Sequence, residues 1–270
     1  MRSLFGLLLC CYATLAHAQQ EVKVYTAQRG TTTIVYAANA GLCPASVQLD
    51  TYLDNMRIVR STEKVFIVPE RTEAFRLCEL TPMNPTRPYN FKYNYKFVLG
   101  NVLLQQYDSA YDYDLPYRQG SGHLVYQGYN GSFSHQGQYA LDFIMPEGTE
   151  VLAAREGVVV KVEQSNSLGC PQETCKQYGN YIQIYHPDGT FAEYIHLKKN
   201  GATVRPGDHV LKGDVIGYSG NTGWSSGPHL HFDCFLAGWE NRKTIMTKFR
   251  IGDGHSAGYL KERETYSRSY

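Results

Sequence analysis

The chain has 270 residues, of which 43% are hydrophobic and 13% aromatic, and its 26 Lys and Arg nearly balance its 25 Asp and Glu. This composition excludes a disordered chain, which would be poorer in aromatic residues and further from neutrality. A formal net charge of +1 argues against a nucleic-acid-binding protein and against a cationic module that adheres to an anionic wall. The length allows one large domain or two of ordinary size.

Residues 1–18 have the pattern of a secretory signal peptide. Arg2 precedes a short apolar stretch over residues 4–9, and Ala16 and Ala18 supply the small residues of a cleavage site. The apolar stretch is too short to span a bilayer, which takes about 20 residues. We therefore expect a secreted or periplasmic protein with no transmembrane segment.

Five cysteines follow the predicted signal peptide, and export would place them in an oxidising compartment. Cys170 and Cys175 close a short loop and are expected to form a local disulfide. Cys43 and Cys78 are predicted to pair across the N-terminal region. Cys234 is left over on an apolar strand and is predicted to be a buried, inert thiol.

Residues 19–115 predict an antiparallel β-sandwich of roughly immunoglobulin type. Short strands, as over residues 46–53 and 91–97, alternate apolar and polar side chains and end at turn signals. This region holds no catalytic constellation, so we expect an accessory packing or positioning domain. Ten of the 22 tyrosines lie between Tyr89 and Tyr139, which leaves open either ordinary strand packing or a surface that binds sugars or peptides by stacking.

Residues 116–245 predict a second β-rich domain in an all-β protein, followed by a tail over residues 246–270. Strand patterns alternate with turn signals such as Pro187-Asp-Gly189, and no long stretch has helical periodicity. His186, His209 and His255 fall at a hairpin, a turn and the tail, and they are expected at solvated positions.

Candidate chemistry concentrates in five residues of this second domain. His229 and His231 are two positions apart on a predicted strand, so both project from one face. His196 adds a third imidazole from another strand, and His135 and Asp142 complete the set. A His-x-His pair alone is a weak signal, but the joint occurrence is typical of zinc, which takes three protein ligands at a catalytic site and keeps one position for water.

The segment from about Tyr126 to Phe235 resembles the lysostaphin/LytM-type zinc metalloendopeptidases, which cleave peptidoglycan peptides. The resemblance is carried by Asp142-Phe-Ile-Met-Pro-Glu-Gly-Thr149, Ala153-Ala-Arg-Glu-Gly-Val-Val159, Gly179-Asn-Tyr-Ile182, Tyr194-Ile-His-Leu197, Gly217-Tyr-Ser-Gly-Asn-Thr-Gly223 and Gly227-Pro-His-Leu-His-Phe232. It implies a LytM-like antiparallel sheet with a zinc groove.

The resemblance also implies roles for the five residues. His135, Asp142 and His231 are expected to bind one zinc ion per chain. His196 and His229 are expected to form the catalytic pair that acts on the zinc-activated water, by accepting its proton and by stabilising the tetrahedral species.

One departure from the family pattern concerns the first motif, which is usually His-x-x-x-Asp. His135 and Asp142 are seven positions apart, so residues 136–139 must bulge if both are to reach the metal. His123 is the only nearby substitute. Asp233 shares the strand parity of the His-x-His pair, and it is either a partner that orients an imidazole or a surface carboxylate.

The sequence thus predicts an exported zinc metalloendopeptidase, expected to be a monomer, that hydrolyses cross-links or stem peptides of peptidoglycan. The alternatives are an inactive relative that binds the wall or activates another hydrolase, and a non-enzymatic adhesion or glycan-binding module. Loops over residues 165–176 and 221–226 are expected to line the groove, with Tyr139 and Tyr194 along its approach. The N-terminal region is hypothesised to cover the groove.

Overall fold

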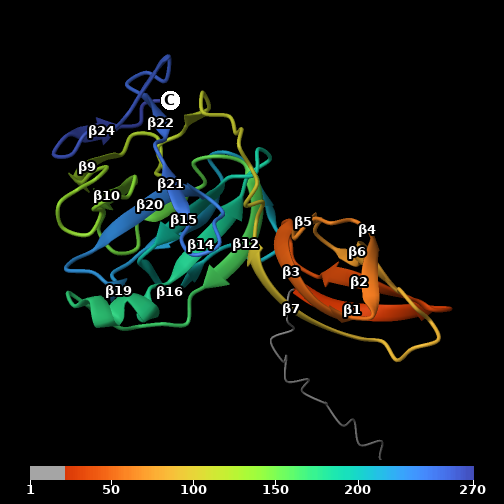
Figure 1. Cartoon of the computed structure of the whole chain (residues 1–270). Coiled ribbons are helices and arrows are strands. Elements are labelled where there is room, and N and C mark those ends of the chain that lie inside the picture. Colours follow the sequence, from red (N-terminus) through yellow and green to blue (C-terminus); the bar gives the residue numbers. More distant parts are fainter. Residues whose placement is uncertain (1–21) are drawn as a thin grey trace, which may run out of the picture.

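A computed structural model describes residues 22–270 (Figure 1), so the predicted signal peptide lies outside the described residues. Strands dominate residues 22–270, and the only helical element there is the 3₁₀ helix η1 (Glu173–Tyr178). The predicted all-β class is confirmed. None of the described elements is a helix with the length and apolarity needed to cross a bilayer.

Two sheets form the N-terminal sandwich, which we define as residues 22–99. One sheet has the order β1 (Val22–Arg29), β2 (Thr32–Asn39), β6 (Thr72–Pro82), β4 (Met56–Arg60). The other has the order β5 (Val65–Val68), β3 (Ala45–Asp54), β7 (Asn90–Leu99). Alternate side chains such as Val35, Val47 and Leu80 bury one core between them. An immunoglobulin domain joins its first, second, fifth and fourth strands in one sheet, so the strand order here differs from the predicted type.

A nine-stranded antiparallel sheet carries the predicted chemistry. Its main path is β17 (His209–Val210), β12 (Gly157–Glu163), β14 (Tyr181–Tyr185), β15 (Phe191–Ile195), β20 (His229–Leu236), β10 (Ala140–Ile144), β9 (Gly122–Gln127), β24 (Thr265–Ser267). β21 (Lys243–Ile245) pairs with the far end of β20. A smaller sheet, β11 (Glu150–Leu152), β18 (Val215–Ser219), β16 (Leu197–Ala202), shares its core through Val151 and Ile216.

The remaining strands complete this second part. The short pair β13 (Gly169–Cys170) and β19 (Gly223–Trp224) is parallel, and β23 (Ser256–Gly258), β22 (Lys248–Ile251), β8 (Asp112–Tyr113) form a small sheet. Residues 246–270, predicted as a tail, therefore form three strands, and Phe249 and Leu260 lie in the core. Arg250 and Arg268 both donate to the buried Asp114, which ties these strands to the rest. Figure 1 shows them on the side opposite the sandwich.

The N-terminal sandwich packs against the far end of β20, away from the histidines. Cys43 lies in an apolar cluster with Phe191 and Phe235, whose rings stack at 5.2 Å. Gly100 follows β7 at this contact with φ +90, and a Cβ there would lie 2.6 Å from the Phe191 ring. Only glycine meets both requirements, the left-handed backbone and the close approach.

The cysteines follow the predictions in part. Cys170 and Cys175 form the expected disulfide. The predicted Cys43–Cys78 disulfide is wrong, because the two residues belong to different cores. Cys78 is a buried free thiol inside the sandwich, and burial raises its pKa to about 11. Cys234 is a fully buried free thiol, as predicted.

His186 contradicts its prediction, whereas His209 and His255 are exposed as expected. The His186 ring is fully buried, contacts the Tyr113 ring edge-on, and donates from Nδ1 to the Glu156 carbonyl at 2.7 Å. Burial lowers its pKa to about 4. The hairpin position is covered by tertiary packing that local turn signals do not encode.

The buried His186 is expected to make the folded state less stable in mild acid. An unfolded imidazole takes up a proton below about pH 6.5, whereas the folded one stays neutral until its own pKa of about 4. The free energy of unfolding should therefore fall by about 2 kcal/mol between pH 7 and pH 5 from this residue alone. Urea unfolding at both pH values tests this. The free energy of unfolding should depend less on pH in His186→Gln than in the wild type, whereas His209→Gln should behave like the wild type. An equal change between pH 7 and pH 5 in all three proteins would contradict the prediction.

Candidate metal and catalytic site

Neighbouring strands bring the three predicted metal ligands together. Asp142 on β10 lies directly opposite His231 on β20, so both side chains project from the same face of the sheet. Asp142 Oδ1 lies 2.9 Å from His231 Nδ1 and 3.3 Å from His135 Nε2. One ligand atom from each residue falls within 4.8 Å of the other two, which is the size of a metal site.

The long spacing before Asp142 is absorbed by a bulging loop, as predicted. The carbonyl of His135 accepts from the Gln138 amide at 2.8 Å, and Gly137 takes the left-handed backbone of this turn with φ +69. The turn accommodates the extra residues between His135 and Asp142 while His135 stays at the cluster. His123 lies elsewhere, with Nδ1 2.7 Å from the Ile144 carbonyl.

Contacts behind the cluster fix how each ligand faces it. His135 donates from Nδ1 to the Gly128 carbonyl at 3.0 Å, which leaves Nε2 for the cluster. The Gln127 amide donates to Asp142 Oδ2 at 2.9 Å, and its oxygen accepts from the Ser134 backbone at 2.9 Å. Gln127 therefore holds both Asp142 and the bulging loop. Sequence reasoning missed it, because the cross-strand register that pairs it with Asp142 is seen only in the structure.

Asp233 orients an imidazole, which decides between the two alternatives left by the sequence. Its carboxylate is buried, and His231 donates to it from Nε2 at 3.2 Å, so Nδ1 of His231 faces the cluster. Arg242 donates to the same oxygen at 2.7 Å and also pairs with Glu193. Burial alone would lower the pKa of His231, but hydrogen bonds to Asp142 and Asp233 outweigh it and raise the pKa to about 10. The surroundings thus favour positive charge at this position.

His196 reaches the cluster through an unusual backbone. Its φ is +67, a left-handed value between β15 and β16 that is uncommon for a residue with a side chain. Strand alternation would place it on the face of Tyr194, but Tyr194 is fully buried in the core. The expectation that Tyr194 lines the groove is therefore wrong, whereas Tyr139 does line it. Such strained residues persist where the surrounding structure holds them and are concentrated at functional sites.

His196 and His229 form a neutral pair beside the three candidate ligands. Their ring centroids are 4.4 Å apart. His196 donates from Nδ1 to the Thr222 carbonyl at 2.7 Å, and His229 donates from Nδ1 to the Gly227 carbonyl at 2.8 Å. In both rings the Nε2 lone pair is left to accept a proton. Burial lowers both pKa values, that of His196 to about 3, so both are uncharged near neutral pH.

A groove with two compartments surrounds these histidines. A compartment of about 330 Å³ and a larger one of about 980 Å³ both include His196 and His231 in their walls. The predicted loops contribute Pro171, Lys176 and Trp224. Among the described residues, none of the N-terminal sandwich lines either compartment, so the hypothesis that this region covers the groove finds no support.

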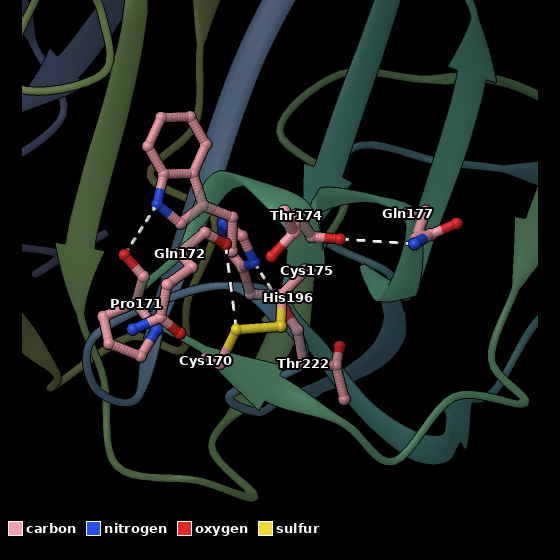
Figure 2. Close-up of a disulfide and its surroundings, with 9 residues drawn as sticks. Cys170, Pro171, Gln172, Thr174, Cys175, Gln177, His196 and Thr222 are labelled. Carbon is pink, nitrogen blue, oxygen red and sulfur yellow. Dashed lines mark hydrogen bonds between the residues drawn. A yellow bond between two sulfur atoms is a disulfide. The ribbon is translucent and has the colours of Figure 1, made fainter.

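The disulfide fastens the loop that carries one groove wall (Figure 2). The Cys170 carbonyl accepts from the Ser225 amide at 3.0 Å, and the Pro171 carbonyl accepts from the Trp224 indole at 3.2 Å. The same segment supplies the Thr222 carbonyl that orients His196. The Cys170–Cys175 loop is thus connected through β13 and β19 to the catalytic pair.

Removal of the disulfide is expected to lower stability measurably. The bridge closes a loop with a sequence separation of 5, and the chain-entropy relation gives about 2 kcal/mol for a loop of this size. A Cys170→Ser, Cys175→Ser double variant should lose that amount in urea unfolding. The wild type should lose the same on full reduction, while the variant should not respond to reductant. Thiol titration is used to confirm that reduction is complete. If the stability of the fully reduced wild type is unchanged, the expectation is contradicted.

The comparisons with known proteins point to one family. Residues 136–243 match peptidase family M23. Lysostaphin of Staphylococcus simulans is 37% identical over 127 residues, 46% of this chain and 23% of its own. Its solved catalytic domain is 32% identical with a TM-score of 0.35, covering 46% of this chain and 86% of that chain. The resemblance to the lysostaphin/LytM-type peptidases is thus confirmed for this region of the chain.

The M23 match leaves much of the relatives' length uncovered. The peptidoglycan DD-endopeptidase ShyA of Vibrio cholerae is 38% identical over 97 residues, 36% of this chain and 20% of its own. The chain thus spans no more than a quarter of the length of these curated relatives. Within this chain, the M23 match begins one residue after His135. The place of His135 at the cluster is therefore an observation of the structure and not of the family match.

Proposed function

We propose that this chain is an exported zinc metalloendopeptidase that hydrolyses peptide bonds of peptidoglycan. The observation that carries the proposal is the convergence of His135, Asp142 and His231 beside the neutral pair His196 and His229. The names of the relatives, lysostaphin and a peptidoglycan DD-endopeptidase, support a peptidoglycan substrate. Action in the periplasm or outside the cell follows from that substrate.

The donor set of the cluster fits zinc. Two imidazole nitrogens and one carboxylate oxygen are ligands that zinc prefers, and three protein ligands leave a position open. His135 would bind through Nε2, His231 through Nδ1 and Asp142 through Oδ1, the atoms that face one another. When bound there, zinc supplies a Lewis acid that polarises the scissile carbonyl and lowers the pKa of water.

The remaining side chains have roles that follow from their hydrogen bonds. Nε2 of His196 or His229 accepts the proton of the attacking water and passes a proton to the leaving amine. The carbonyls of Thr222 and Gly227 keep both rings in the tautomer that this transfer needs. Asp233 keeps Nδ1 of His231 directed at the cluster. All five predicted side chains converge, which favours activity over an inactive relative.

The test is zinc-dependent solubilisation of purified peptidoglycan by the chain from residue 19 onward. Dye-labelled walls with glycine bridges and walls with direct stem cross-links are incubated with the protein, with a chelator, and with zinc restored. We expect dye release from at least one wall type, lost with chelator, regained with zinc and absent in His229→Ala. The absence of zinc-dependent release from every wall would overturn the proposal.

A further inference from the structure

The disulfide loop, which we define as residues 168–178, holds the neighbouring segment 224–227 in place. The Ser225 amide donates to the Cys170 carbonyl at 3.0 Å, and the Trp224 indole donates to the Pro171 carbonyl at 3.2 Å. Among residues 22–270, the hydrogen bonds that reach this segment from outside the stretch 221–229 all come from the disulfide loop. The position of the segment therefore depends on the loop.

This segment orients His229. The ring donates from Nδ1 to the Gly227 carbonyl at 2.8 Å, and the same nitrogen lies 3.1 Å from Ser225 Oγ. Ser225 Oγ in turn lies 2.6 Å from Asn221 Oδ1. A displacement of residues 225–227 would therefore turn the His229 ring.

His196 has a separate support. The Thr222 carbonyl that orients it belongs to a residue whose hydroxyl donates to the Leu197 carbonyl at 2.8 Å and accepts from the Asn180 amide at 3.0 Å. These partners lie outside the disulfide loop. Loosening the loop would thus affect His229 and leave His196 and the three candidate ligands in place.

The bridge supports the loop, and one of its sulfurs can be reached from solvent. Cys175 is the only buried residue of η1, and a 3₁₀ helix of six residues needs tertiary contacts to persist. Cys170 is partly exposed, with Sγ 3.8 Å from the Gln172 carbonyl (Figure 2). Exposed disulfides are the labile ones. The other cysteines of residues 22–270 are buried.

We propose that Cys170–Cys175 is a redox-modification site that controls the activity of the groove. In the oxidised protein the segment 224–227 keeps His229 oriented, and in the reduced protein it releases this ring. The inference rests on the proposed function and adds its regulation.

The reductant is a protein dithiol. One of its thiolates attacks Sγ of Cys170, the Cys170–Cys175 bond breaks, and Cys175 leaves as a thiolate that takes up a proton. The second donor thiolate attacks the donor sulfur of the mixed disulfide and releases Cys170, which is protonated in turn. Two electrons and two protons thus pass from the dithiol, which becomes a disulfide.

The experiment compares the zinc-loaded chain from residue 19 onward before and after treatment with reduced thioredoxin, with thiol titration to follow opening of the bridge. The initial rate of dye release from labelled walls should fall by about ten- to a hundredfold, as expected for a catalytic group displaced by about 1 Å. Oxidised glutathione should restore the rate. Zinc content should stay constant, and thermal unfolding should show a folded protein in both states.

The matched control is the Cys170→Ser, Cys175→Ser double variant, which keeps the buried cysteines. It should have the low rate and should not respond to thioredoxin. A second readout does not depend on activity: the chain has two tryptophans, so Trp239→Phe leaves Trp224 as the only fluorophore of this kind. Reduction should increase the quenching of Trp224 by acrylamide, because the loop that holds its indole loosens.

The route through Ser225 is tested by combining substitution with reduction. Ser225→Ala should lower the rate of the oxidised protein, and reduction should then lower it by less than in the wild type, because both changes act on His229. Ser226→Ala, at the exposed neighbour, should respond to reduction as the wild type does.

An unchanged rate in the fully reduced wild type overturns the inference while the proposed function stands. Failure of thioredoxin to open the bridge, loss of zinc on reduction, or full additivity of Ser225→Ala with reduction also overturns it. If walls are solubilised in neither redox state, the proposed function itself fails, whatever the quenching of Trp224 shows.

Discussion

Replacing His135 by alanine is expected to reduce bound zinc from about one ion per chain to well below one tenth, because two remaining ligands do not make a stable protein zinc site. His135 Nε2 lies within 3.3 Å of both other candidate ligand atoms, so its loss removes one of the three candidate ligands. Metal analysis after dialysis measures the stoichiometry, and wall hydrolysis should fall with it.

The matched control is His123→Ala. This histidine is close in sequence, yet its Nδ1 is bound to the Ile144 carbonyl away from the cluster. The His123→Ala variant should therefore keep the zinc content of the wild type. If His135→Ala also retains full zinc, the assignment of His135 as a ligand fails, and with it the role of the bulging loop.

Substitution of His196 by asparagine is expected to lower kcat by about 10²–10⁴, the usual range for a lost acid–base group. Asparagine tolerates the left-handed backbone at this position, where φ is +67, so the fold should be preserved. Zinc content should remain that of the wild type, since His196 is outside the ligand cluster.

The measurement is steady-state hydrolysis of a defined peptide, with zinc analysis and thermal unfolding on the same samples. A loss of less than about tenfold with normal zinc would show that His229 alone serves as the acid–base group, and that His196 has another role. A loss of zinc together with activity would instead mark His196 as part of the metal site.

Strand alternation predicted which side chains of β20 share a face. It places His229, His231 and Asp233 on one face of β20, and the structure agrees. The loop bulge between His135 and Asp142 was also predictable, because only a bulge allows both to meet. The shared face depends on the two-residue period of a strand, which is a local property of the sequence.

The sequence failed where tertiary packing or backbone strain decides. Alternation places His196 with Tyr194, and the left-handed φ of His196 breaks that rule. The sequence places His186 at a hairpin and predicts a solvated side chain, yet packing against Tyr113 buries it. The pairing of Cys43 with Cys78 assumed one N-terminal core, whereas Cys43 belongs to the contact with Phe191. None of these outcomes is set by neighbours along the chain.

The contact between the N-terminal sandwich and β20 has a mechanical consequence. Two domains joined only by a polar linker move independently, whereas a packed apolar contact restrains them. Here the stacked Phe191 and Phe235 rings and the close approach of Gly100 form such an apolar contact. The position of the sandwich therefore constrains the position of the groove, so a partner bound by the sandwich would meet the groove in a restricted range of orientations.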